Sequence, residues 1–231
     1  MVRLRASLST EFERRTTPHR RNFMLTFENE AGLAGFERVI GIDEAGRGPL
    51  AGPVVASAIL LRSTSFVARV DDSKKMTDRQ RERAFLEIFE KSYVGIGVMS
   101  EAVIDSHNIL QATFLAMASA VRQLMESLPA QEKAQPEFQK RTLLLVDGPL
   151  FKSDLPYPFR PIIDGDARSL SIACASIVAK VYRDRILKTY DRIYPQYGFK
   201  QHKGYPTVSH RKAILENGLS PIHRRTFKVK L

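Results

Sequence analysis

Four acidic residues lie where predicted strands end or just after one, and a glycine lies within a few residues of each. They are Asp43, Glu44, Asp147 and Asp166. Ends of neighbouring strands meet at one edge of a sheet, so these side chains can gather into one site. Carboxylate oxygens are the ligands that Mg²⁺ and Mn²⁺ prefer. Without a metal the clustered carboxylates repel one another, and the pKa of at least one must rise. The pattern therefore predicts a divalent-metal site.

Asp43 and Glu44 are adjacent, and adjacent strand residues point to opposite faces of a sheet. Both can serve one site only if the chain turns at once, and the glycine- and proline-containing segment 45–49 offers such a turn. Taken singly, each acid could equally well be a helix cap or surface charge as a member of a metal site. The glycine-rich turn favours the metal site. Asp184 is excluded, because it lies about 25 Å beyond Asp166 if one helix joins them. We expect Asp184 to be a structural partner of Arg183, Arg185 or Lys188.

Apolar patterning predicts the elements that position these acids. Strands are predicted over 39–43, 54–62, 93–99, 142–147 and 161–163. Helices are predicted over 78–92, 108–128, 169–190 and 208–217, with a short lead-in element in 23–36 and a polar connection over 129–136. Early strands followed by alternating helices and strands predict an α/β fold with a mixed five-stranded sheet flanked by helices and a helical C-terminal extension. Strand 142–147 is almost wholly apolar, which is typical of a central strand buried on both faces.

Composition indicates a packed domain with a polyanionic partner. The chain has 231 residues, 43% hydrophobic residues and a formal net charge of +11. Residues 180–231 hold 13 basic and 3 acidic residues, and residues 1–21 hold 6 arginines and 2 glutamates. Such clustering favours nucleic acid first and an anionic membrane second, although a basic tail can also serve solubility alone. We expect a flexible basic arm over 1–22, a catalytic domain over 23–190 and a basic substrate-binding segment over 191–231.

The single cysteine and the hydropathy pattern indicate where the protein works. Cys174 lies among small residues and is expected to be buried, and one cysteine excludes an internal disulfide and a multi-cysteine zinc site. The apolar stretch 51–61 is too short to span a bilayer. Residues 1–21 lack the apolar core of a secretory signal. We therefore expect a cytoplasmic protein without a membrane segment.

Residues 40–55, IGIDEAGRGPLAGPVV, are too specific for chance, and here the chain resembles ribonuclease HII, the type 2 ribonuclease H family. Further blocks of that family follow in order and extend the resemblance over about residues 36–228. They are 72–75, 146–148, 165–169, 171–180, 183–185, 202–207 and 220–227. The resemblance implies an RNase H-like fold. It also implies cutting of RNA within RNA–DNA hybrids, including at single ribonucleotides embedded in duplex DNA, to give 5′-phosphate and 3′-hydroxyl ends.

The resemblance also implies residue roles. Asp43, Glu44, Asp147 and Asp166 would be the catalytic acids that bind two Mn²⁺ or Mg²⁺ ions. Gly46, Arg47 and Gly48 would meet the ribose at the RNA–DNA junction, and Tyr205 would stack on the deoxyribose beyond it. Lys74, Lys75, Arg168 and Ser169 would contribute phosphate contacts. Asp164 departs from the family, which commonly has Lys there, and this puts a phosphate contact in doubt.

The residues themselves agree with this reading. Two divalent ions can activate water and stabilise the leaving oxygen, so no His or Ser nucleophile is needed, and none is recognisable. Glycines let the backbone approach a 2′-hydroxyl, the group that distinguishes RNA from DNA. Tyr205 could instead be a core tyrosine, and Lys75 and Arg168 ordinary surface charges.

Two other functions remain open. A non-catalytic hybrid-binding protein would keep Arg47, Tyr205 and the basic tail but would not need four acids. A nucleotide-phosphate loop at 46–52 lacks the Gly-Lys-Ser/Thr ending and the following helix. We expect a monomer, with a sliding-clamp contact as an open possibility.

Overall fold

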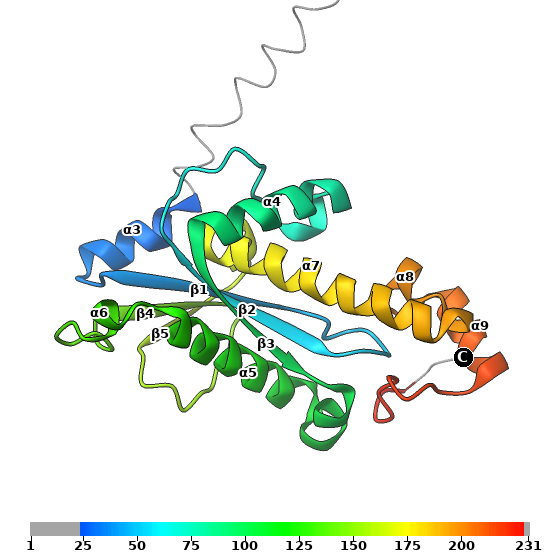
Figure 1. Ribbon diagram of the computed structural model, residues 1–231. Coiled ribbons are helices and arrows are strands. Elements are labelled where there is room, and N and C mark those ends of the chain that lie inside the picture. Colours follow the sequence, from blue (N-terminus) through cyan, green and yellow to red (C-terminus); the bar gives the residue numbers. More distant parts are fainter. Residues whose placement is uncertain (1–23, 229–231) are drawn as a thin grey trace, which may run out of the picture.

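The computed structural model describes residues 24–228, and within that range five strands form one mixed sheet in the order β3-β2-β1-β4-β5 (Figure 1). The strands are β1 (Arg38–Ala45), β2 (Val54–Leu61), β3 (Ser92–Met99), β4 (Thr142–Asp147) and β5 (Phe159–Ile162). The first three are antiparallel neighbours, whereas β1, β4 and β5 run parallel. The predicted fold class is therefore confirmed.

Helices cover both faces of the sheet (Figure 1). Helix α5 (Glu101–Ser127) lies on one face, and α7 (Leu170–Ile193) lies on the other with α4 (Asp78–Lys91) beside it. The shorter helices are α3 (Thr26–Leu33), α6 (Ala130–Lys133), α8 (Phe199–His202) and α9 (Val208–Asn217). Short 3₁₀ helices are η1 (Ser73–Lys75), η2 (Gly165–Ala167) and η3 (Pro195–Tyr197). No helix within residues 24–228 is long and apolar enough to cross a bilayer.

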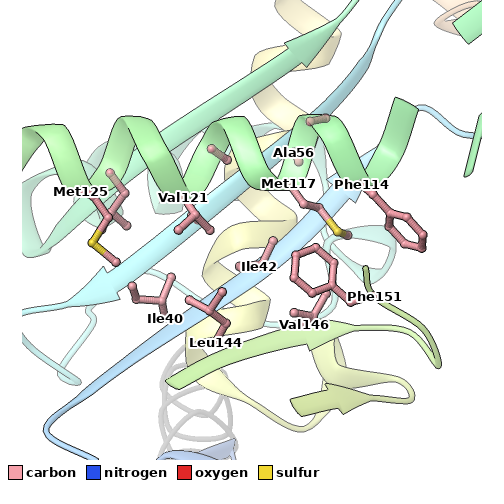
Figure 2. Close-up of a cluster of buried hydrophobic side chains, with 14 of the residues drawn as sticks. Ile40, Ile42, Ala56, Phe114, Met117, Val121, Met125, Leu144, Val146 and Phe151 are labelled. Atoms are coloured by element: carbon pink, nitrogen blue, oxygen red, sulfur yellow. The ribbon is translucent and has the colours of Figure 1, made fainter. Parts of the chain in front are cut away.

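Alternation along β1 and β4 divides the core into two layers. Ile40 and Ile42 of β1 join Leu144 and Val146 of β4 beneath α5 (Figure 2). The intervening residues Leu143 and Leu145 pack instead with α3 and the start of α7. Strand β4 is thus buried on both faces, as predicted, and each such side chain contributes roughly 1.5–3 kcal/mol through burial. Because side chains alternate, the odd-numbered residues of both strands face α7.

The segment after α7 forms a small apolar core of its own against the end of α7 and the loop after β1. Tyr197, Phe199, Ile214 and Ile222 pack there with Leu187 of α7, and Leu50 and Ala51 complete the cluster. The helical C-terminal extension is confirmed. The expected boundary after residue 190 falls within α7, which ends at Ile193, and the expected arm over 1–22 lies outside the described residues.

Two helix predictions differ from the structure. Helix α5 begins at Glu101, seven residues before the predicted start at 108, and it contains a break at Asn108, where φ is 66°. The Asn108 side chain accepts hydrogen bonds from the backbone N–H groups of Leu110 and Gln111, as a helix N-cap does. The sequence pattern therefore detected the second half of α5. The polar connection over 129–136 also contains the short helix α6.

Candidate active site

Asp147 is the last residue of β4, and Asp43 lies near the carboxyl end of the parallel neighbouring strand β1. Ile42 of β1 is the partner of Val146 of β4, so the residues that follow them lie side by side. Both side chains belong to the odd-numbered set that faces α7. The α7 residue Ser176 makes a side-chain hydrogen bond to the Asp43 carboxylate, and the Glu44 backbone N–H donates to Asp43 Oδ1 at 2.7 Å. The sheet register therefore brings two predicted acids together.

Asp166 joins this pair from the 3₁₀ helix η2. The backbone N–H of Gly165 donates to Asp147 Oδ1 at 2.7 Å, which fixes η2 against the end of β4. Asp166 itself is buried, and its Oδ2 lies 3.5 Å from Nζ of Lys74 in η1. Lys74 thus contacts the acid cluster from an exposed position.

Glu44 reaches the site without the immediate turn that the sequence predicted. Strand β1 continues to Ala45, and Glu44 still pairs with Ala56 of β2. The chain turns only after Ala45, within the predicted segment 45–49. The expectation that an immediate turn is needed for both acids to serve one site is wrong, because the antiparallel ladder with β2 extends past the two acids. Glu44 nevertheless lies close enough to interact electrostatically with Asp43, and its Oε1 lies 3.5 Å from the guanidinium of Arg47.

Burial and mutual repulsion dominate the electrostatics of these acids. Burial, followed by the charges of Glu44 and Asp147, raises the pKa of Asp43 well above its ordinary value. Burial also raises the pKa of Glu44, against the opposing effect of Arg47, and burial together with Asp166 raises the pKa of Asp147. Burial opposes the charged form of Lys74, but the negative charges of Asp166 and Asp43 outweigh it and raise the pKa of the ammonium. The cluster thus carries more negative charge than its surroundings compensate.

The donor chemistry fits hard divalent cations. All four side chains offer carboxylate oxygens. A cation would remove the repulsion that, together with burial, raises the pKa values of Asp43, Glu44 and Asp147. Among residues 24–228, however, no group of three or more His, Cys, Asp or Glu side chains is arranged to hold an ion as it stands. Lys74 and Arg47 instead contact Asp166 and Glu44. Metal binding would therefore require these side chains to adjust.

Two buried arginines hold the glycine-rich loop that follows β1. Arg183 of α7 donates to the carbonyls of Pro53 at 2.9 Å and Ala51 at 3.0 Å. Arg224 donates to the carbonyls of Gly52 at 3.0 Å and Arg47 at 2.9 Å. Burial lowers the pKa of Arg183 to about 10 and that of Arg224 to about 9.

The sequence predicted Arg183 only as a possible partner of Asp184, and it predicted no individual role for Arg224. Both arginines lie in the family blocks 183–185 and 220–227, which was the only indication of a role in the sequence. Because arginines are usually exposed, these two were interpreted as part of the basic tail. Ser176 was missed for a similar reason, since it lies inside an apolar helix. These three residues position the predicted site residues.

Gly46 adopts a conformation that the loop requires. Its φ is +103°, in the region that favours glycine, and a Cβ there would lie 2.2 Å from Arg183 Nε. Gly48 faces Tyr205, because a Cβ on Gly48 would lie 3.8 Å from Tyr205 Cε1. The Tyr205 side chain is 42% exposed, so the alternative of a core tyrosine is wrong. The loop and the ring form two sides of one surface.

The predicted phosphate contacts lie in different surroundings. Lys75 is exposed with its Nζ 3.3 Å from Asp72, and Arg168 is exposed with its guanidinium 4.9 Å from the Phe27 ring centroid. Ser169 is fully buried as the N-cap of α7, and its hydroxyl donates to Glu28 Oε1 at 2.6 Å. Its hydroxyl is thus engaged inside the protein and is not exposed to a phosphate.

Two further acids have structural surroundings. Asp164 is exposed and left-handed with φ of 53°, a conformation that Asp tolerates better than Lys. Asp184 contacts Lys180 one turn earlier in α7 at 2.7 Å. The ion-pair partner of Asp184 is therefore Lys180, which was not predicted. Of the predicted partners, Arg183 interacts electrostatically with Asp184 but bonds to the loop, and Arg185 pairs with Glu82. Cys174 is buried as expected, and burial raises the pKa of its thiol.

Comparisons with known proteins agree with this geometry. A curated ribonuclease HII of Geobacter metallireducens is 50% identical over 204 residues, which cover 88% of this chain and 89% of that protein. The crystal structure of ribonuclease H2 from Pyrococcus horikoshii OT3 superposes with a TM-score of 0.60 and 25% identity, over 83% of this chain and 94% of that one. Bst-RNase HIII in complex with Mn²⁺ has the same fold, with a TM-score of 0.59, 19% identity and coverage of 81% and 65%. The family profile described as Ribonuclease HII matches residues 40–230. The chain therefore belongs to the ribonuclease HII family, and it is an endonuclease hydrolase of the ribonuclease H type.

Proposed function

We propose that this chain hydrolyses the RNA strand of RNA–DNA hybrids and cuts at single ribonucleotides embedded in duplex DNA. One observation carries the proposal. A cluster of two buried and two half-buried carboxylates adjoins a glycine-rich loop, and that loop faces an exposed tyrosine ring across Gly48. Membership of the ribonuclease HII family supports the coarser part, cleavage of RNA paired with DNA.

The four acids would hold two divalent cations, Mn²⁺ or Mg²⁺. When bound, such cations supply Lewis acidity toward the attacking water and the leaving oxygen. Asp43 and Asp147 fit this role because the sheet register aligns them, and Asp166 fits it because Gly165 ties η2 to Asp147. Ser176 and the Glu44 backbone N–H each donate to Asp43, which orients its carboxylate. Lys74 would release Asp166 and become free to contact a phosphate.

The loop and the ring would recognise the junction. Backbone groups of Gly46, Arg47 and Gly48 can approach a ribose 2′-hydroxyl closely, since glycine has no Cβ. The ring of Tyr205 can pack flat on the next sugar, where a deoxyribose fits and a 2′-oxygen would crowd the ring. Hydrolysis would leave a 5′-phosphate and a 3′-hydroxyl.

The basic C-terminal segment would bind phosphates without reading sequence. Outside that segment, Lys75 and Arg168 are exposed candidates for further phosphate contacts. A cytoplasmic location, a monomeric state and a sliding-clamp contact stay predictions. Light scattering after size-exclusion chromatography tests the second of these.

The test uses three labelled substrates: a DNA duplex with one ribonucleotide, an RNA–DNA hybrid and an all-DNA duplex. Each is incubated with the protein and Mn²⁺ or Mg²⁺, and the products are resolved on a denaturing gel. We expect cleavage of the first two and none of the third. Metal-independent binding of the ribonucleotide-containing substrates without any cleavage would instead favour the non-catalytic hybrid-binding protein.

A matched pair of variants separates the acid cluster from general charge. Asp43→Asn removes one buried carboxylate and keeps an oxygen that can accept the Glu44 N–H. Asp154→Asn removes an exposed carboxylate that only pairs with Arg122 on the surface. We expect the first to lose cleavage and the second to retain it. Undiminished cleavage by Asp43→Asn would contradict the proposed site.

A further inference from the structure

Three histidines from the C-terminal segment meet behind the tyrosine that faces the glycine-rich loop. The His202 and His210 rings stack with centroids 4.2 Å apart, and the rings of His210 and His223 lie 5.2 Å apart. His210 and His223 are buried, with 0% and 2% exposure. Nothing in the proposed chemistry uses an imidazole, so the cluster needs a separate account.

The cluster is not a metal site. No group of three His, Cys, Asp or Glu side chains in the described part of the chain could hold an ion, and this includes the three histidines. Their ring nitrogens are engaged in hydrogen bonds instead. The partners of those bonds determine which nitrogen of each ring carries a proton.

Backbone groups fix the tautomer of His202. The Gly204 N–H donates to Nδ1 at 3.1 Å, so Nδ1 must be unprotonated. Nε2 lies 2.7 Å from the carbonyl oxygen of Tyr197, which can only accept. His202 is therefore neutral, with its proton on Nε2.

His223 and His210 form a directed chain that ends on Tyr205. The Ser220 backbone N–H donates to His223 Nδ1 at 2.9 Å, so the proton of His223 is on Nε2. That N–H donates to His210 Nε2 at 3.0 Å. His210 then carries its proton on Nδ1, which donates to the Tyr205 carbonyl at 3.0 Å. The assignments from the two ends agree, since the contact between the two rings has one donor and one acceptor.

The hydrogen bonds of these histidines hold the turn at residues 204 and 205, and this turn contacts the glycine-rich loop. The Gly204 carbonyl accepts from the Leu50 N–H at 2.8 Å, and the Tyr205 N–H donates to the His202 carbonyl at 2.9 Å. Gly204 has φ of +81°, and a Cβ there would lie 2.5 Å from the Ala51 carbonyl oxygen. A small shift at this turn would therefore move the Tyr205 ring relative to Gly48.

We propose that His202, His210 and His223 are positioning residues for Tyr205, and that three neutral imidazoles of fixed tautomer hold the backbone of residues 204 and 205 at the substrate surface. The inference rests on the proposed function, because it assumes that Tyr205 contacts the sugar. Adding a proton to His210 Nε2 would make it face the Nε2–H of His223, and adding one to His223 Nδ1 would make it face the Ser220 N–H. The chain of bonds therefore requires all three rings to be neutral.

The surroundings of the rings favour the neutral forms. Burial, helped by the neighbouring histidines, lowers the pKa of His210 and of His223 to about 4. Burial also lowers the pKa of His202, with Asp191 raising it and Lys203 lowering it further. Phe199 packs edge-on against His210, and Tyr197 lies against His223.

Nitrogen-15 NMR of the full-length protein labelled in its histidines tests the tautomers directly, without substrate or metal. At neutral pH we expect a proton on Nδ1 of His210 and on Nε2 of His202 and His223. The exposed His107 serves as the reference for a ring in solvent. A reversed tautomer at His210 or His223, or a charged ring at either, would overturn the inference whether or not the protein cleaves hybrids.

Kinetics of two variants test the positioning role. His210→Asn keeps an N–H donor near the position of Nδ1, whereas His210→Leu has none. For the duplex with one ribonucleotide we expect His210→Leu to raise KM on the order of tenfold, the value of one hydrogen bond, with a smaller change in kcat. His210→Asn should lie close to wild type, and His107→Ala should match it.

The outcomes separate the two ideas. Equal kinetics of His210→Leu and wild type would overturn the positioning role, as would equal losses in His210→Asn and His210→Leu. If His210→Leu fails to fold, the tautomers measured in the wild-type protein and the KM measured for His210→Asn still test the positioning role. No cleavage by wild type, together with the expected tautomers, would contradict the proposed function and leave the histidine chain intact.

Discussion

Lowering the pH from 7 to 5 should destabilise the protein through His210 and His223. Both have a pKa of about 4 in the folded protein, against 6.5 for an ordinary histidine. Between these values the unfolded chain binds protons that the folded protein does not, so stability falls as the pH falls below about 6.5. The free energy of unfolding continues to fall down to about pH 4. Below pH 4 it changes no further through these histidines, because both the folded and the unfolded state are then protonated.

The magnitude follows from the two pKa values. From pH 7 to 5, proton binding by the unfolded state lowers the free energy of unfolding by about 2 kcal/mol per histidine, or about 4 kcal/mol for both. Total stabilities of domains are about 5–15 kcal/mol, so the effect is large. Asp43, Glu44 and Asp147 act in the opposite direction, because their raised pKa values make the folded state bind protons more readily.

A comparison of variants removes that opposing contribution. Urea unfolding followed by far-ultraviolet circular dichroism gives the free energy of unfolding at pH 5, 6 and 7. His223→Asn has one titrating ring fewer, so its loss between pH 7 and 5 should be about 2 kcal/mol smaller than that of wild type. His107→Ala, which changes an exposed ring, should keep the full loss. The same pH dependence in wild type and His223→Asn would refute the assignment of neutral, buried histidines.

Four further predictions concern the site. Asp43→Asn should reduce cleavage at least about a thousandfold, since each acid is needed to hold the ions. Calorimetry of the same variant without metal should give an equal or higher melting temperature, because a buried charge that its neighbours repel has been removed. Gly46→Ala should cost about 1–3 kcal/mol in urea unfolding, because φ of +103° is strained for Ala and its Cβ meets Arg183. Arg224→Lys keeps the charge but cannot reproduce the forked bonds to the loop carbonyls, so we expect a loss of about 2–4 kcal/mol by the same measurement. Raising the salt from about 50 to about 200 mM should raise KM for the hybrid at least about tenfold in steady-state assays, with little change in kcat, because binding relies on phosphate contacts.

Local sequence patterns predicted most of the strands and helices of the fold. Alternation and apolar runs found the five strands, because burial acts on each strand separately. The errors lie where a tertiary contact extends or interrupts an element. Strand β1 runs past Asp43 because β2 supplies a pairing partner. Helix α5 begins before Asn108, although its helical conformation is interrupted at that residue.

The sequence also predicted the four acids and the glycine-rich loop as site residues, because those residue types indicate their chemistry without tertiary information. It missed the groups that act by position: Ser176 on Asp43, the arginines beneath the loop, and the histidines behind Tyr205. Histidine protonation states depend on partners that come from distant parts of the segment, and no local pattern records them.

The amino-acid sequence alone thus determined the elements, the chemical types at the site and the family resemblance, since propensity, periodicity and motif are local properties. Only the tertiary structure decided which faces the acids share, that two arginines lie buried under carbonyl oxygens, and that Ser169 points inward to Glu28. These depend on register, burial and hydrogen-bond direction, which arise only when separate segments pack together.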